Sequence, residues 1–163
     1  MTHSTQDDRY PTTDTLRCDP RMARLLFRAY YDELNTVSAY QYYGLMLTEH
    51  NPALAALFES ISMTEMRHFR LLGKTVCRLG GNPIIRTELR VPPAELCRGT
   101  SKEAAEAAAC KLLHSALAAE QSAAWEYRTL AQKTGDSALK KILCRLAAEE
   151  EEHAQMLREL GKT

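Results

Sequence analysis

An internal repeat of apolar residues interrupted by glutamate and histidine constrains the fold of this 163-residue chain more than any other feature. Two segments that lie 85 positions apart carry similar residue types at the same spacing of three and four. The first contributes Leu54, Leu57, Phe58, Ile61, Glu65, His68 and Leu72, and the second Leu139, Ile142, Leu143, Leu146, Glu150, His153 and Leu157. Because this spacing follows one face of a helix, each Glu-x-x-His pair is expected to point into the core.

A second relation links the segments that precede these two, with an offset of 87 positions. Glu33 and Tyr40 in one segment correspond to Glu120 and Tyr127 in the other, again on an apolar helical stripe. Each half of the chain therefore supplies Glu-x6-Tyr followed by Glu-x-x-His. We expect two similar helical hairpins related by a pseudo-twofold axis.

Helix start and stop signals divide the chain into four helices. An N-cap residue followed by proline occurs at Asp19–Pro20 and at Asn51–Pro52, and Thr100 with Glu103 forms a capping-box pattern. Glycines follow the second and third helical segments, where a helix commonly ends. The expected helices span about residues 20–50, 52–79, 101–134 and 137–160.

The segment 81–99, between the second and third helices, is far longer than the usual connection between bundle helices. It contains three prolines and no sustained apolar period. About 19 extended residues reach about 60 Å, whereas a helix of about 28 residues is about 42 Å long, so this segment can cross the whole bundle. The sequence therefore predicts an all-α, antiparallel four-helix bundle with one long crossover between helices 2 and 3, which is the ferritin-like topology.

Four glutamates on core-facing stripes indicate a site for cations, because a buried carboxylate without a compensating charge costs several kcal/mol. Two divalent ions would balance four carboxylates, with the two histidines binding as neutral imidazoles. A glutamate from each of two helices plus Glu-x-x-His from each of the others is the ligand set of di-iron and di-manganese bundles. The expected ligands, with Glu65 and Glu150 bridging the two metals, are Glu33, Glu65, His68, Glu120, Glu150 and His153.

At these residues the chain resembles the rubrerythrin-like branch of the ferritin-like superfamily, in which Glu-x6-Tyr and Glu-x-x-His recur in this order. The resemblance covers about residues 20–160 and implies two iron ions as the cofactor. It also implies that Tyr40 and Tyr127 hydrogen-bond to metal-bound carboxylates. Typical rubrerythrins carry an additional glutamate three residues after the third-helix ligand, at the position where this chain has Ala123.

A second departure from typical rubrerythrins concerns electron transfer. The five cysteines include no Cys-x-x-Cys pair, so the chain lacks the rubredoxin-type iron site that typical rubrerythrins carry. The resemblance therefore implies a separate electron-donor protein as a partner. A weaker resemblance, at residues 68–73 and 79–83, is to bacterial relatives grouped with manganese catalases, and it implies two manganese ions as the alternative cofactor.

These sequence patterns are compatible with four functions. The leading hypothesis is a di-iron oxidoreductase that reduces hydrogen peroxide or dioxygen at a small open site between the metals. The second is a manganese catalase-like enzyme, in which peroxide is both oxidant and reductant. The third is an iron-binding or storage protein that assembles from many subunits, and the fourth is a structural bundle without a redox metal. A homodimer is compatible with each of them.

Length and composition limit the domain count and the partners. A chain of this length forms one ordinary domain, which we place at residues 19–163, after a flexible or loosely docked polar arm at 1–18. Lys plus Arg and Asp plus Glu both number 21, so the charge favours neither nucleic acid nor an anionic membrane surface. No uncharged run approaches the roughly 20 residues of a membrane span, and the N-terminus has no signal-peptide pattern, so we expect a cytoplasmic protein.

Two further groups of side chains have an expected environment. Glu149 begins the acidic run Glu149–Glu152, which we interpret as one inward ligand, Glu150, among solvent-exposed neighbours. The alternative for Glu149 is a hydrogen bond to a ligand histidine on a facing helix. We expect the cysteines to be reduced and mostly buried, namely Cys18, Cys77, Cys97, Cys110 and Cys144.

Overall fold

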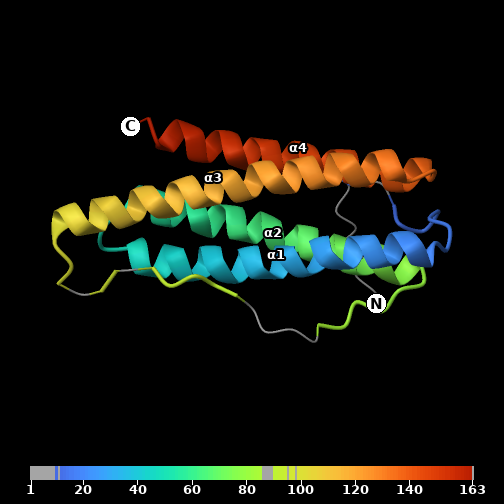
Figure 1. Cartoon of the computed structure of the whole chain (residues 1–163), viewed down its shortest axis with the longest axis horizontal. Coiled ribbons are helices and arrows are strands. Elements are labelled where there is room, and N and C mark those ends of the chain that lie inside the picture. Colours follow the sequence, from blue (N-terminus) through green and yellow to red (C-terminus); the bar gives the residue numbers. More distant parts are fainter. Residues whose placement is uncertain (1–9, 11, 86–89, 95, 98, 163) are drawn as a thin grey trace, which may run out of the picture.

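The computed structural model describes residues 10, 12–85, 90–94, 96–97 and 99–162 of the chain. Within this part the chain forms four α-helices and no strand (Figure 1). The helices are α1 (Pro20–Leu47), α2 (Pro52–Arg78), α3 (Lys102–Lys133) and α4 (Ser137–Leu160). The all-α four-helix bundle predicted from the sequence is confirmed, and every helix boundary lies within three residues of its expected position.

Polar side chains begin the four helices. They accept hydrogen bonds from backbone N–H groups of the first turn, which otherwise lack partners within the helix, and they are Asp19, Asn51, Ser101 and Asp136. The sequence predicts Thr100 as the cap of α3, but Ser101 takes that position, and the Thr100 hydroxyl instead bonds to the backbone of Cys97. The capping pattern therefore locates the helix start to within one residue.

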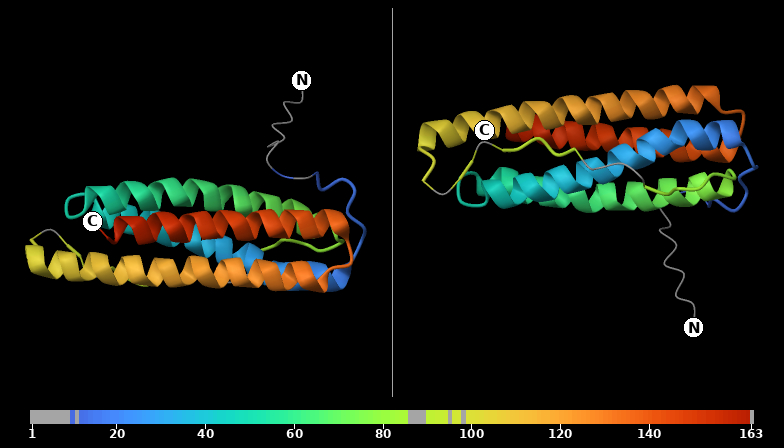
Figure 2. Two further views of the ribbon diagram at one scale, coloured as in Figure 1. Left: turned by 90° about the horizontal axis from the view of Figure 1, so that it is seen from above. Right: turned by 60° about the horizontal axis from the view of Figure 1, so that its bottom comes forward.

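The four helices form two antiparallel hairpins that lie side by side (Figure 2). Helix α1 packs closely along α2, and α3 packs closely along α4. The connection from α2 to α3 leaves one end of the bundle, and its described residues after 90 reach the opposite end (Figure 1). Ala94 and Leu96 in this connection are buried, and the backbone N–H of Ala94 donates to the Tyr42 hydroxyl of α1 at 3.2 Å. The predicted crossover is therefore present and packs against the bundle.

The apolar core consists of two clusters separated by a polar middle layer. One cluster joins the first turns of α1 and α4 to the last turns of α2 and α3, and it includes the fully buried Leu26 and Leu143. The other cluster lies towards the opposite end of the bundle and includes Phe58 and Leu157. Between the two clusters, each helix contributes buried charged residues. The apolar stripes of the sequence thus carry these charged residues into the centre of the bundle.

The described part of segment 1–18 packs on the bundle. Tyr10 is 9% exposed and belongs to the first core cluster, and Leu16 lies against the same cluster. The sequence predicts a flexible or loosely docked arm because the segment is polar. Tyr10 and Leu16 nevertheless carry apolar surface, and burial of that surface stabilises their contact with the bundle. Residues 1–9 and 11 of the predicted arm lie outside the described residues.

The cysteines lie on the surface of the molecule. The five cysteines are free and exposed, so the expectation that they are mostly buried is wrong. The inward stripes are instead filled by leucine, alanine and aromatic side chains, which leaves the cysteines on outward positions and in connecting segments.

In the described part of the chain, no helix has a stretch that is both long and apolar enough to span a membrane.

Replacing the fully buried Leu146 by alanine should lower the free energy of unfolding by about 2–5 kcal/mol, because apolar contacts are lost and a cavity remains. The control is Leu45→Ala on α1, where the side chain is 76% exposed and the change should stay within about 0.5 kcal/mol. Urea denaturation followed by circular dichroism measures both values. Equal destabilisation by the two substitutions would contradict this assignment of the core.

Candidate metal centre

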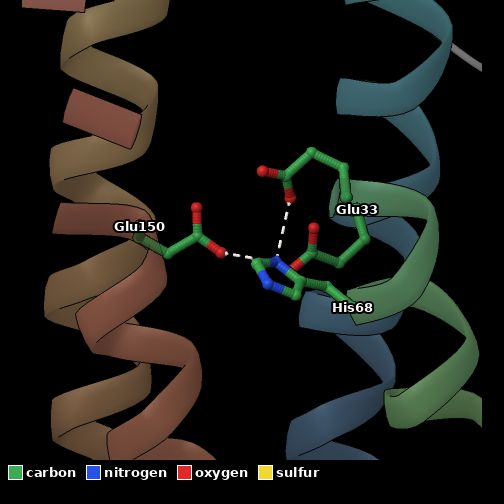
Figure 3. A group of neighbouring side chains, drawn as sticks. Glu33, His68 and Glu150 are labelled. Atoms are coloured by element: carbon green, nitrogen blue, oxygen red, sulfur yellow. Dashed lines mark hydrogen bonds and ion pairs between the residues drawn. The ribbon is translucent and has the colours of Figure 1, made fainter. Parts of the chain in front are cut away.

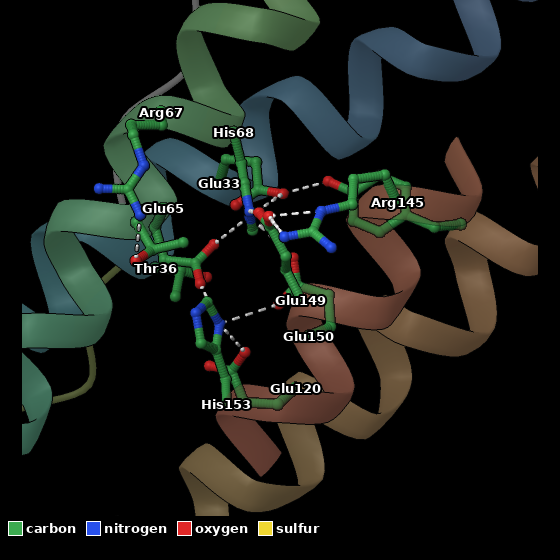
Figure 4. Close-up of polar contacts among 12 residues, drawn as sticks. Glu33, Thr36, Glu65, Arg67, His68, Glu120, Arg145, Glu149, Glu150 and His153 are labelled. Atoms are coloured by element: carbon green, nitrogen blue, oxygen red, sulfur yellow. Dashed lines mark hydrogen bonds and ion pairs between the residues drawn. The ribbon is translucent and has the colours of Figure 1, made fainter. Parts of the chain in front are cut away.

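The middle layer of the bundle brings together six buried side chains from all four helices. Helices α1 and α3 contribute one glutamate each, and α2 and α4 contribute one Glu-x-x-His pair each. Figure 3 shows Glu33, His68 and Glu150 pointing toward one another, and Figure 4 shows the wider network of polar contacts. Each of the six is at most 5% exposed, and together they are the residues that the sequence predicts as ligands: Glu33, Glu65, His68, Glu120, Glu150 and His153.

The six side chains form two overlapping groups of four. Within each group, one potential ligand atom per residue can be chosen so that all four lie within 4.8 Å of one another. The groups are Glu33, Glu65, His68 and Glu150, and Glu65, Glu120, Glu150 and His153. Because Glu65 and Glu150 belong to both groups, each can offer one oxygen to each of two ions. This is the bridging arrangement expected from the sequence, and that the six residues bind metal stays a prediction.

The two histidine rings present the same nitrogen to the carboxylates. Nδ1 of His68 lies 3.1 Å from Oε2 of Glu65 and 3.0 Å from Oε1 of Glu150. Nδ1 of His153 lies 2.7 Å from Oε1 of Glu65 and 3.3 Å from Oε2 of Glu120. The ring centroids are 5.8 Å apart. A metal ion in either group would therefore be bound through Nδ1, and Nε2 would remain free to contact other groups.

Each shared glutamate has one buried oxygen without a hydrogen-bond partner. Oε1 of Glu65 and Oε1 of Glu150 lie at ion-pair distance from an imidazole nitrogen, but neither contact has hydrogen-bond geometry. A buried carboxylate oxygen in this state costs free energy that a bound cation would recover. Carboxylate and imidazole donors suit divalent iron or manganese, and four carboxylates match the charge of two such ions. The residues present therefore fit a two-metal centre.

Two tyrosines link the carboxylates of one hairpin to the other hairpin. The hydroxyl of Tyr40 on α1 donates to Glu120 on α3, and the hydroxyl of Tyr127 on α3 donates to Glu33 on α1. Burial and the neighbouring carboxylate charges raise the pKa of both phenols well above the usual value, so both remain donors. The two tyrosines bond to the carboxylates expected for them, and each hydrogen bond joins one half of the pseudo-twofold repeat to the other.

Glu149 belongs to the site and not to a solvated acidic run, so the interpretation first given to it is wrong and the alternative, a hydrogen bond to a ligand histidine on a facing helix, is the contact found. It is 4% exposed, and its Oε2 lies 2.7 Å from Nε2 of His68. It also accepts hydrogen bonds from the Tyr10 hydroxyl and from the guanidinium of Arg145. Burial raises the pKa of Glu149, but hydrogen bonds from His68 and Tyr10 outweigh this effect and lower it to about 2. Its position four residues before His153, beside the apolar stripe, is the signal in the sequence that could have indicated an inward orientation.

Protons compensate part of the buried negative charge when no metal ion is bound. Burial, together with the neighbouring glutamates, raises the pKa of Glu120 to about 8 and that of Glu33 well above its usual value. Burial lowers the pKa of the histidines, but hydrogen bonds to the carboxylates raise the pKa of His153 to about 11 and that of His68 well above the usual range. Metal ions would therefore compete with protons for the same buried groups.

A cavity of about 40 Å³ lies against the carboxylates, between α1 and α3. Its lining includes the small side chains Ala29, Ala119 and Ala123. A water molecule needs about 10–15 Å³ on this scale, so the cavity has room for a molecule of the size of dioxygen or hydrogen peroxide. Ala123 occupies the position at which typical rubrerythrins carry an additional glutamate, and the small alanine leaves this space beside the cluster open.

Comparison with protein families identifies the group to which the chain is related. The family model for rubrerythrin matches residues 24–161, which is most of the chain. The chain belongs to the rubrerythrin family. The matched range contains the six clustered residues, Tyr40, Tyr127 and Glu149, so the candidate centre of this rubrerythrin-family chain lies entirely within it. The resemblance inferred from the sequence is confirmed. A comparison with curated proteins gives no match.

Solved structures similar to this rubrerythrin-family chain share its fold. Bacterioferritin BfrA of Mycobacterium tuberculosis is 22% identical, with a TM-score of 0.71 over 90% of this chain and 87% of that one. Bacterioferritin of Desulfovibrio desulfuricans, described with a diiron site, is 21% identical, with a TM-score of 0.70 over 87% and 78%. The manganese catalase KatB of Anabaena is 18% identical, with a TM-score of 0.66 over 98% and 78%. At these identities the likeness concerns the fold alone, and it confirms the ferritin-like topology.

Binding of two divalent ions at this centre should release several protons per chain at pH 7, because the raised pKa values of His68, His153, Glu120 and Glu33 favour their protonated forms when no metal is bound. Affinity should fall as the pH is lowered, since groups with raised pKa values hold their protons more fully at lower pH. Calorimetric titration with Mn²⁺ in two buffers of different ionisation enthalpy counts the protons. Binding without proton release, and with equal affinity at pH 6 and pH 8, would contradict the proposed competition.

Proposed function

We propose that this chain is a di-iron oxidoreductase that reduces hydrogen peroxide or dioxygen with electrons from a separate donor protein. The observation that carries the proposal is the pair of four-residue groups that share Glu65 and Glu150. Membership of the rubrerythrin family supports the choice of iron, as does the diiron site described for the similar bacterioferritin of Desulfovibrio desulfuricans. The donor is proposed as a separate protein because the chain has no Cys-x-x-Cys pair for an electron-transfer iron of its own.

When bound, two iron ions would supply one electron each, and these electrons with two protons convert hydrogen peroxide into two molecules of water. The protein's own part is to hold the ligands in place before the oxidant arrives. Tyr40 and Tyr127 restrain the carboxylates of Glu120 and Glu33 by hydrogen bonds from the opposite hairpin. The apolar clusters on both sides of the middle layer keep its side chains buried.

The cavity between α1 and α3 supports a small oxidant rather than a large substrate. Four of the expected ligands, Glu33, Glu65, Glu120 and Glu150, line it directly, so a molecule inside would lie against the metal-binding groups. Its volume of about 40 Å³ is far below that of the pockets that bind drug-sized molecules. An organic or protein donor would therefore pass electrons from the surface of the bundle rather than enter the site.

Two alternatives use the same cluster. A manganese catalase-like enzyme would convert two molecules of hydrogen peroxide into water and dioxygen and would need no donor. A storage protein would oxidise ferrous ions and deposit them inside a shell of many subunits. The similar structures include representatives of both kinds of protein at 18–22% identity, so each alternative is an outcome that the following experiment separates.

The first test is the metal content of the native protein, followed by one turnover with peroxide. Elemental analysis should find about two irons per chain. Anaerobic addition of one equivalent of hydrogen peroxide to the reduced protein should oxidise both ferrous ions and release no dioxygen, which optical absorption and an oxygen electrode measure. Glu65→Ala should abolish metal binding because Glu65 belongs to both ligand groups, and Glu152→Gln, at an exposed position of α4, is the control.

The other outcomes separate the competing functions. No metal, and no uptake of supplied Fe²⁺ or Mn²⁺, would exclude every metal-dependent function. Steady release of dioxygen from peroxide by a protein that holds two manganese ions would identify the catalase-like alternative. A native mass of many subunits, with far more than two irons retained per chain, would identify the storage alternative.

Filling the cavity should slow the reaction of the reduced protein with peroxide without changing its metal content. Ala123→Leu places a larger side chain in the cavity wall, and we expect a rate about tenfold lower, equivalent to about 1.4 kcal/mol in the barrier. Stopped-flow absorption measures the rate, and Ala118→Leu on the exposed side of α3 is the matched control. An unchanged rate in Ala123→Leu would show that the oxidant reaches the cluster by another path.

A further inference from the structure

The two halves of the centre differ in what lies behind their histidines. Nε2 of His68 lies 2.7 Å from Oε2 of Glu149, whose carboxylate is buried. The offset of 85 that relates the two Glu-x-x-His pairs assigns Thr64 of α2 as the counterpart of Glu149, and threonine carries no charge. Within the described residues, the ion pairs of His153 all involve Nδ1, on the side of the clustered carboxylates.

Glu149 is itself held in place by contacts that have no counterpart in the other half. Arg145, one turn earlier on α4, donates from Nε at 2.8 Å to Oε1 of Glu149, with Nη2 of the same guanidinium at 2.7 Å (Figure 4). The Tyr10 hydroxyl donates to Oε2, the oxygen that also faces His68. The position equivalent to Arg145 in α2 is Ser60. Tyr10 precedes the repeat, so it has no equivalent residue in the other half.

These contacts can fix the tautomer and the orientation of His68. When Nε2 carries the hydrogen and donates it to a carboxylate, the lone pair of Nδ1 is left facing the three glutamates of its group. Such a hydrogen bond also increases the basicity of the ligating nitrogen, and partners of this kind typically change metal affinity 10–100-fold. His153 has no such carboxylate at the equivalent position, because Thr64 stands there.

We propose that the two metal positions are unequal, and that the position around His68 binds a divalent cation more tightly than the position around His153, because Glu149, Arg145 and Tyr10 act on His68 alone. The inference rests on the two-metal centre of the proposed function and adds an order of filling to it. At low metal supply the chain would hold one ion beside His68, and the second ion would bind and leave beside His153. Glu149 is in this sense a positioning residue that acts through the histidine.

The test is a titration of the metal-free full-length protein with Co²⁺, followed by its visible absorption and by calorimetry. The wild type should bind two ions in two steps, the first at least about tenfold tighter than the second. His153→Ala should retain the tight step and lose the weak one, whereas His68→Ala should lose the tight step. Two equal steps in the wild type, or equal losses in the two histidine variants, would overturn the proposal.

Substitutions of Glu149 separate its action on His68 from a general structural role. Glu149→Gln keeps an oxygen acceptor but removes the charge, and Glu149→Leu removes both, so the tight step should weaken about tenfold in the first and further in the second. Tyr10→Phe removes one hydrogen bond and should weaken the same step by less. In all three variants the weak step should keep its wild-type affinity, and the control Glu152→Gln should change neither step.

The readouts distinguish failure of this inference from failure of the proposed function. Equal weakening of both steps in Glu149→Leu, together with earlier thermal unfolding of the metal-free variant, would indicate a structural role and overturn the inference. Absence of any Co²⁺ binding to the wild type would overturn the two-metal centre itself. Two ions bound with equal affinity would leave the two-metal centre in place and remove only the proposed difference between its halves.

Discussion

The burial of four carboxylates in the middle of an apolar bundle is the constraint on which the rest of this structure depends. Each of them would cost several kcal/mol without a partner. The chain surrounds them with two imidazoles and two phenol hydroxyls, and it closes the layer on both sides with apolar clusters. Because these side chains are almost fully buried, each polar contact within the layer is stronger than it would be on the surface. What the layer still lacks is positive charge, which protons or metal ions can provide.

The same polar contacts also join the two halves of the fold. Close backbone packing lies mainly within each hairpin, whereas α1 and α3, and α2 and α4, approach one another at few positions. Tyr40 and Tyr127 cross from one hairpin to the other, and so does the contact between His68 and Glu149. Two ions, each bound by ligands from both hairpins, would add a further link between them. Since such a site exists only in the folded chain, metal binding would stabilise the fold.

The fold by itself does not select the chemistry. Bacterioferritins and a manganese catalase share this topology at low identity, so the reaction depends on which metal is bound and on what can reach it. In this chain, the features proposed to affect access to the centre and its affinity for metal are single side chains. Ala123 helps to line a cavity beside the carboxylates, and Glu149 lies 2.7 Å from Nε2 of His68.

Helical periodicity in the sequence determines the bundle and the six clustered residues, because residues three and four positions apart share a helix face whatever the helix packs against. The tertiary structure alone decides the environment of Glu149, since its partner His68 lies 81 positions away on a facing helix and a residue beside an apolar stripe can point either way. The docking of Tyr10 and the exposure of the cysteines depend in the same way on which surfaces meet. The repeat predicts two similar halves, whereas only the packing of α2 against α4 and of the N-terminal segment brings Glu149 against His68 and Tyr10 against Glu149.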